Sequence, residues 1–79
     1  MKIHVRYFAS LREALGRSKE TREAPEGATP ASVLRDALGE AHARRAAAVA
    51  FAVNREHAPG DRPLRDGDEV AFLPPVSGG

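Results

Sequence analysis

Hydrophobic and polar residues alternate at the start of the chain, over residues 2–8 (KIHVRYF), in the pattern of a half-buried β-strand. Further strands are predicted within residues 48–56 (AVAFAVNRE), where bulky apolar residues alternate with alanine as in a central strand, and over residues 69–73. Residues 18–25 (SKETREAP) suit a solvated edge strand, because their charges discourage further pairing. The predicted buried face of the sheet consists of Ile3, Val5, Tyr7, Val49, Phe51, Val53, Val70 and Phe72.

Two helices are predicted between these strands. In SLREALG, Ser10 followed three residues later by Glu13 matches a capping box, and Gly16 is placed to end a helix of about two turns. The stretch GATPASVLRDALGEAH predicts the main helix, with Thr29 as its cap and Pro30 at the first helical position. Its apolar stripe, which must be buried, consists of Val33, Leu34, Ala37, Leu38 and Ala41.

The order of these elements predicts the fold class. Gly39 costs about 1 kcal/mol relative to alanine inside a helix, so an early helix end is also compatible with the pattern. Turns are predicted at residues 59–61 (PGD) and 66–67 (DG). We therefore expect an α+β domain of the β-grasp type over residues 1–73, with a mixed sheet of four to five strands and one main helix on one face. Residues 74–79 are predicted to form an extended C-terminal tail that ends in Gly-Gly.

Composition narrows the functional classes. A chain of 79 residues forms one small domain, and its formal net charge of +1 does not favour nucleic acid as a partner. The sequence has no cysteine, which excludes disulfides and thiol chemistry by its own side chains. No apolar run approaches the roughly 20 residues that span a bilayer, so we expect no membrane association and a cytoplasmic location.

Few side chains are candidates for catalysis or metal binding. His4, His42 and His57 show no metal-ligand spacing, so we assign no metal. The acidic residues between 61 and 69 are interspersed with arginines and lack calcium-loop spacing, which favours turn chemistry. Ser10 has no base beside it in sequence, so nucleophilic catalysis by a side chain is not supported.

The C-terminal residues FLPPVSGG are the remaining candidate. Pro74 and Pro75 fix φ and remove two backbone donors, which holds the segment extended. Six residues at about 3.3 Å each project roughly 20 Å, enough to enter a partner's active site. Gly78 and Gly79 add no side chain, so the terminal carboxylate could pass through a narrow channel and be activated by ATP. The alternative is that Gly-Gly is simply a flexible end.

The motifs VRYFASLREALG, ATPASVLRDAL, AVAFAVNRE and LRDGDEVAFLPPVSGG resemble the small subunits of molybdopterin synthases, within the MoaD/ThiS group of ubiquitin-like sulfur carriers. This resemblance covers nearly the whole chain. It implies that Gly79 is adenylated by a ubiquitin-activating-type adenylyltransferase using ATP and converted to a thiocarboxylate with sulfur from a sulfurtransferase. It also implies that the tail delivers this sulfur to a pterin precursor in a large subunit that supplies the catalytic lysines. This chain would then be non-catalytic and bind no cofactor itself.

The resemblance also implies which residues face the partner. They are Phe8, Arg12, Leu73, Pro74, Pro75, Val76, Ser77 and Gly78. Phe8 could equally pack in the core, and Arg12 could equally be a solvated helix residue. The same terminus also suits a sulfur carrier for thiamine, cysteine or tRNA thiolation, a ubiquitin-like protein modifier, or a plain interaction domain that does not need Gly-Gly.

Overall fold

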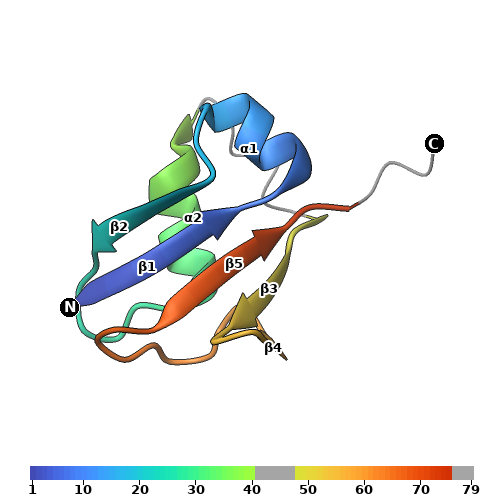
Figure 1. Ribbon diagram of the computed structural model, residues 1–79. Helices are drawn as coiled ribbons and strands as arrows, with labels where there is room; N and C mark the ends of the chain where they lie inside the picture. Colours follow the sequence, from blue (N-terminus) through green and yellow to red (C-terminus); the bar gives the residue numbers. More distant parts are fainter. Residues whose placement is uncertain (41–47, 76–79) are drawn as a thin grey trace.

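The structure, a computed structural model, describes residues 1–40 and 48–75. Its elements are β1 (Lys2–Tyr7), α1 (Ala9–Leu15), β2 (Lys19–Glu23), α2 (Pro30–Leu38), β3 (Ala50–Val53), β4 (Glu56–Ala58) and β5 (Glu69–Leu73). The strands form one mixed sheet in the order β2-β1-β5-β3-β4. β1 and β5 are parallel, and the other neighbours are antiparallel. Both helices lie on the same side of this sheet (Figure 1), so no helix of the described residues covers its other face.

The core lies between the sheet and the two helices, as the alternation in β1 predicted. Ile3, Val5 and Tyr7 are buried, whereas the residues between them are exposed. The central strand β5 contributes Val70 and Phe72, both fully buried. The predicted edge strand is confirmed as β2, which pairs with β1 alone. Buried residues of the helices complete the core: Leu11, Pro30, Val33, Leu34, Ala37 and Leu38.

The start of α2 is confirmed, and the chain uses a second polar residue there. The Thr29 hydroxyl accepts a hydrogen bond from the Ser32 backbone N–H at 3.2 Å, and the Ser32 hydroxyl accepts one from the Thr29 N–H at 2.9 Å. This reciprocal pair satisfies two helix-terminal donors. The helix ends at Leu38, and Gly39 follows with a φ of 64°, a conformation that favours glycine. Ala41, the last residue of the predicted stripe, lies outside the described residues.

The predicted capping box of the short helix is wrong. α1 begins at Ala9, its N-cap is Phe8, and no side chain caps it. The Phe8 carbonyl accepts hydrogen bonds from the N–H groups of Leu11 at 3.1 Å and Arg12 at 3.4 Å. Because the first turn therefore closes on Phe8, Ser10 already lies inside the helix and cannot act as its cap. The predicted end is correct, since Gly16 adopts φ 71° and donates to the Arg12 carbonyl.

The predicted order of elements missed the strand β4. Asn54 and Arg55 both have positive φ, of 51° and 70°, and connect β3 to β4 as a two-residue hairpin. β3 itself is shorter than the predicted segment and lies between β5 and β4 rather than at the centre of the sheet. Arginine is not one of the residues that usually occupy the second position of such a turn, where glycine is typical. The sequence pattern therefore did not indicate the hairpin.

Candidate functional site

The C-terminal tail follows the central strand of the sheet. β5 pairs with β1 on one side and with β3 on the other. Its Phe72 is fully buried, with ring centroids 5.7 Å from Tyr7 and 5.9 Å from Phe51. Aromatic rings at these separations and tilts attract one another in addition to their burial. Phe72, the last core residue before the tail, is therefore held by strand pairing on both sides of β5 and by ring contacts with Tyr7 and Phe51.

The residues that follow Phe72 emerge stepwise from the protein. Leu73 closes β5 opposite Ala50 and is half-buried, as is Pro74, whereas Pro75 is exposed. Neither proline has an N–H to donate, so β5 stops pairing where they begin. The extended tail from Pro74 onward stays a prediction, of which the structure describes Pro74 and Pro75. The residues Val76, Ser77, Gly78 and Gly79 lie outside the described residues, so their predicted roles are not tested by the structure.

Phe8 and Arg12 lie close to the origin of the tail. Phe8 directly follows Tyr7, and Leu73 directly follows Phe72, the residue paired with Tyr7, so both lie at the same end of the sheet. Phe8 is half-buried and does not belong to the core cluster. Arg12 is exposed one helical turn after Phe8, whose carbonyl accepts its N–H. This position is compatible with a partner contact for both residues, which remains a prediction.

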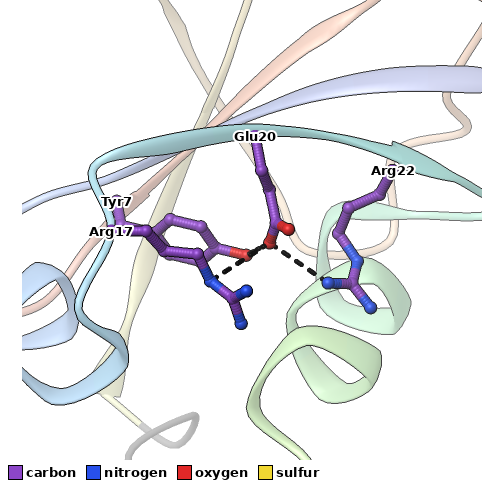
Figure 2. A network of polar contacts seen from close by, with 4 residues as sticks. All are labelled: Tyr7, Arg17, Glu20 and Arg22. Carbon is purple, nitrogen blue, oxygen red and sulfur yellow. Dashed lines mark hydrogen bonds and ion pairs between the residues drawn. The ribbon is translucent and has the colours of Figure 1, made fainter.

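A polar network that the sequence did not suggest holds β1 against β2 near this end (Figure 2). The Tyr7 hydroxyl donates a hydrogen bond to Glu20, whose Oε2 also accepts one from Arg22 Nη1 at 3.1 Å. Arg17 Nε lies 3.6 Å from the same oxygen, and the Arg17 guanidinium lies 5.8 Å from the Tyr7 ring centroid. Tyr7 is thus fixed at both ends, by Phe72 at the ring and by Glu20 at the hydroxyl.

This network shifts the pKa of both acids in it. Burial and the hydrogen bond to Glu20 raise the pKa of Tyr7 to about 12. Burial alone would raise the pKa of Glu20, but the hydrogen bonds from Tyr7 and Arg22 outweigh it and hold that pKa below its usual value. At neutral pH the pair is therefore a neutral phenol donating to an ionised carboxylate.

The acidic residues before β5 stabilise turns, as predicted. Asp66 Oδ1 accepts the Lys2 N–H at 2.7 Å, and Asp68 accepts the Arg65 N–H at 2.8 Å and the Asn54 side-chain amide at 3.0 Å. Burial alone would raise the pKa of Asp68, but its hydrogen bonds, first from the Arg65 backbone and then from Asn54, hold it below its usual value. Gly67 supplies the positive φ of 89° that this turn requires.

The histidines do not form a site in the part of the chain that the structure describes. His4 is exposed on β1 with its Nδ1 3.4 Å from the Thr21 hydroxyl, and His57 is exposed on β4. His42 lies outside the described residues. Within residues 1–40 and 48–75, no three acidic or histidine side chains are grouped so that they could hold a metal ion. Neither helix described there has the length and apolar character needed to cross a membrane.

The described residues form a mixed five-stranded sheet with both helices on one face, and the C-terminal tail follows the central strand β5. This arrangement defines a β-grasp domain of the ubiquitin-like class. The sequence matches the ThiS family model over residues 5–79. The chain belongs to the ThiS family.

Sequence relatives cover the full chain. A protein of Chlamydomonas reinhardtii named molybdopterin synthase sulfur carrier subunit is 40% identical and is aligned over 100% of both chains. A protein of Mycobacterium tuberculosis with the same name is 37% identical, over 100% of this chain and 99% of its own. The resemblance inferred from the motifs is therefore confirmed at the level of the whole sequence.

Solved structures agree with the fold. SAMP1 of Haloferax volcanii has a TM-score of 0.80 at 30% identity, with 100% of both chains covered. A complex of subunits 1 and 2 of the molybdopterin-converting factor from Helicobacter pylori contains a chain with a TM-score of 0.66 at 28% identity, again with 100% coverage of both. The ubiquitin-like β-grasp prediction is confirmed by these neighbours.

Proposed function

We propose that this chain is the sulfur carrier subunit of a molybdopterin synthase. The observation that carries the proposal is the 40% identity, over the whole of both chains, to a relative with that name. The anchored origin of the tail supports it, because a carrier must present its reacting end at a defined place. Phe72 is fully buried at that origin, and Pro74 and Pro75 have no N–H with which β5 could continue its pairing.

The chemistry of the proposal uses the terminal carboxylate of Gly79. The carboxylate attacks the α-phosphate of ATP, bound by an adenylyltransferase, and forms an acyl adenylate with release of pyrophosphate. Hydrosulfide, delivered at the sulfide oxidation level by a sulfurtransferase, then attacks the acyl carbonyl, AMP leaves, and a thiocarboxylate remains. In the large subunit this sulfur is transferred to the pterin precursor, and water restores the carboxylate. In this scheme the carrier itself supplies no catalytic side chain. The adenylyltransferase consumes ATP, which is compatible with a cytoplasmic location for the pathway.

The large subunit is the partner that the proposal requires during sulfur transfer. The Helicobacter pylori neighbour was solved as a complex of subunits 1 and 2, which supports a pairing of the same kind here. Leu73, Pro74 and Pro75 form the described part of the arm that would enter the large subunit. Phe8 and Arg12 would contact it beside the entrance.

The test is the mass of the protein isolated from its native host, with the C-terminal peptide sequenced. We expect one oxygen of Gly79 to be replaced by sulfur. Deletion of Gly78 and Gly79 should abolish this modification and the synthesis of molybdopterin in a mixture with adenylyltransferase, sulfurtransferase and large subunit. Glu26→Ala is the matched control, because Glu26 is exposed in the loop after β2, at the opposite end of the sheet.

A second function, covalent protein modification, has support from one neighbour. Haloferax volcanii SAMP1 is described as a small archaeal modifier protein, and it has 30% identity to this chain. In that case the activated Gly79 would acylate lysine amines, and larger adducts linked through the tail would be found in the host. If the terminus carries neither sulfur nor an adduct, and the deletion leaves every activity intact, both functions are wrong and a plain interaction domain remains.

A further inference from the structure

The uncovered face of the sheet carries two cations directly opposite each other. Arg6 on β1 is registered with Lys19 on β2, and both are exposed. Side chains of such a pair on adjacent strands have Cβ atoms about 4.5–5.5 Å apart, and like charges at this distance destabilise the sheet. Within the described residues, neither Arg6 nor Lys19 makes an ion pair. Among the described residues, this unfavourable pair therefore has no counterion.

The two cations border an open groove of about 680 Å³ over β2, β1 and β5. The other side chains that face it are His4, Thr21 and Glu69, while Val5 and Glu20 alternate toward the core side and line it with backbone. Two carboxylates lie near the groove, and neither forms an ion pair with Arg6 or Lys19. Glu20 is held by Tyr7 and Arg22, and Glu69 Oε1 lies 3.9 Å from Arg55 Nε. Arg6 and Lys19 thus give the groove positive charge that no ion pair within residues 1–40 and 48–75 neutralises.

The position of Arg6 connects this groove to the origin of the tail. Its guanidinium lies 5.1 Å from the ring centroid of Phe8, which lies beside Leu73 at the end of the sheet. A cation over an aromatic ring is attracted to it, which holds the guanidinium toward that end. A protein that receives the tail would therefore meet Arg6 as well.

We propose that the groove of Arg6 and Lys19 binds an acidic segment of the protein that receives the tail, which we take to be the large subunit. This proposal rests on the proposed function and extends it to a defined charged contact. A carboxylate between the two cations would satisfy both and remove their repulsion. Two cations at one position, on a chain of net charge +1, are too few to follow a nucleic-acid backbone.

The test is Lys19→Glu, measured in two ways on the full chain. Dissociation constants for the large subunit from the same source are determined at low and at physiological ionic strength, together with thermal unfolding of the free carrier. We expect binding to weaken about tenfold at low salt and to lose much of its salt dependence. We expect the free variant to be at least as stable as the wild type, because an opposite-charge pair replaces a like-charge pair.

The matched control is Arg35→Glu, an equal change of charge on an exposed position of α2, on the other side of the sheet. It should bind the large subunit as the wild type does. If Lys19→Glu and the wild type bind the large subunit equally well at low salt, the assignment of the groove is wrong, while the proposed function stands. Weakened binding only to the adenylyltransferase would overturn the choice of the large subunit. A wild-type chain that fails to bind the large subunit would overturn the proposed function, and the groove assignment with it.

Discussion

Arg6 and Tyr7 are neighbours on β1, and Lys19 and Glu20 are neighbours on β2, but the two faces that they form differ in electrostatic character. On the inner face, the Tyr7 hydroxyl and two arginines converge on the Glu20 carboxylate (Figure 2). On the outer face, two cations are opposite each other without a counterion among the described residues. The charged groups of these two strands are thus paired on the inner face, whereas Arg6 and Lys19 on the outer face have no ion-pair partner among the described residues.

This difference separates what holds the domain together from what it offers to other molecules. A buried polar group must find its partner within the fold, since leaving it unpaired costs about 1–3 kcal/mol. An exposed cation is solvated and carries no such requirement. Mutations on the inner face should therefore act on stability, and mutations on the outer face should act on binding.

The largest expected contrast is between alanine substitutions at the two neighbouring positions of β1. Tyr7→Ala removes a fully buried ring that contacts Phe72, and should lower the free energy of unfolding by about 3–5 kcal/mol. Arg6→Ala removes an exposed side chain, and should change it by less than about 0.5 kcal/mol. Urea unfolding of both variants measures the difference. Equal losses at the two positions would contradict the division between the faces.

A smaller effect should appear at alkaline pH. The pKa of Tyr7 is raised from the ordinary value of about 10 in the unfolded chain to about 12 in the fold. Stabilisation by the neutral phenol is therefore complete below pH 10 and is lost as the pH rises through 12. The expected loss from this residue is about 2–3 kcal/mol.

The measurement for this effect is the difference between wild type and Tyr7→Phe in unfolding free energy from pH 8 to 12. Taking the difference removes the pH dependence that the two proteins share. The phenylalanine variant lacks the ionising group, so its stability should fall less steeply. Parallel pH profiles for the two proteins would show that Tyr7 ionises equally well when folded.

The smallest effect concerns the charge of Glu20. Because its pKa is lowered in the fold, its ionised form stabilises the protein above the unfolded pKa of about 4.3, and this stabilisation is lost as the pH falls through the folded pKa. Glu20→Gln should cost about 1 kcal/mol at pH 7 and nothing once the wild-type carboxyl is protonated. The control is Glu23→Gln on the same strand, where the side chain is 80% exposed and little change is expected. A Glu20→Gln penalty that persists at pH 2 would show that shape, not charge, matters there.

Most of the fold could be predicted from the sequence because its strongest signals are local. The alternation from Lys2 to Tyr7 and the Thr29-Pro30 start of α2 depend on residues within one element, and both are confirmed. β4 could not be predicted, because Glu56–Ala58 has no apolar alternation. It is a strand because it pairs with β3. The false cap at Ser10 has the same origin, since the position of Phe8 at the end of the sheet decides where α1 begins.

The candidate site was predictable in part for the same reason. The two prolines and the buried Phe72 before them are visible in the sequence, and they locate the origin of the tail. The contact between Tyr7 and Glu20 and the pairing of Arg6 with Lys19 depend on the register of β1 against β2, which no local pattern defines. The available signal was modest: a tyrosine on an inward position of β1, and a glutamate and an arginine two residues apart in the edge strand.

The central position of β5 has a consequence for synthesis on the ribosome. It is the last of the five described strands to be made. Within the described residues, it alone pairs with both β1 and β3, and so joins the β1–β2 pair to the β3–β4 pair. A nascent chain in which residues 69–73 have not yet left the ribosome holds two separate pairs of strands, and an isolated pair of strands is marginally stable at best. An interrupted translation product would therefore lack both the arm and the folded surface beside it, and could not occupy a partner unproductively.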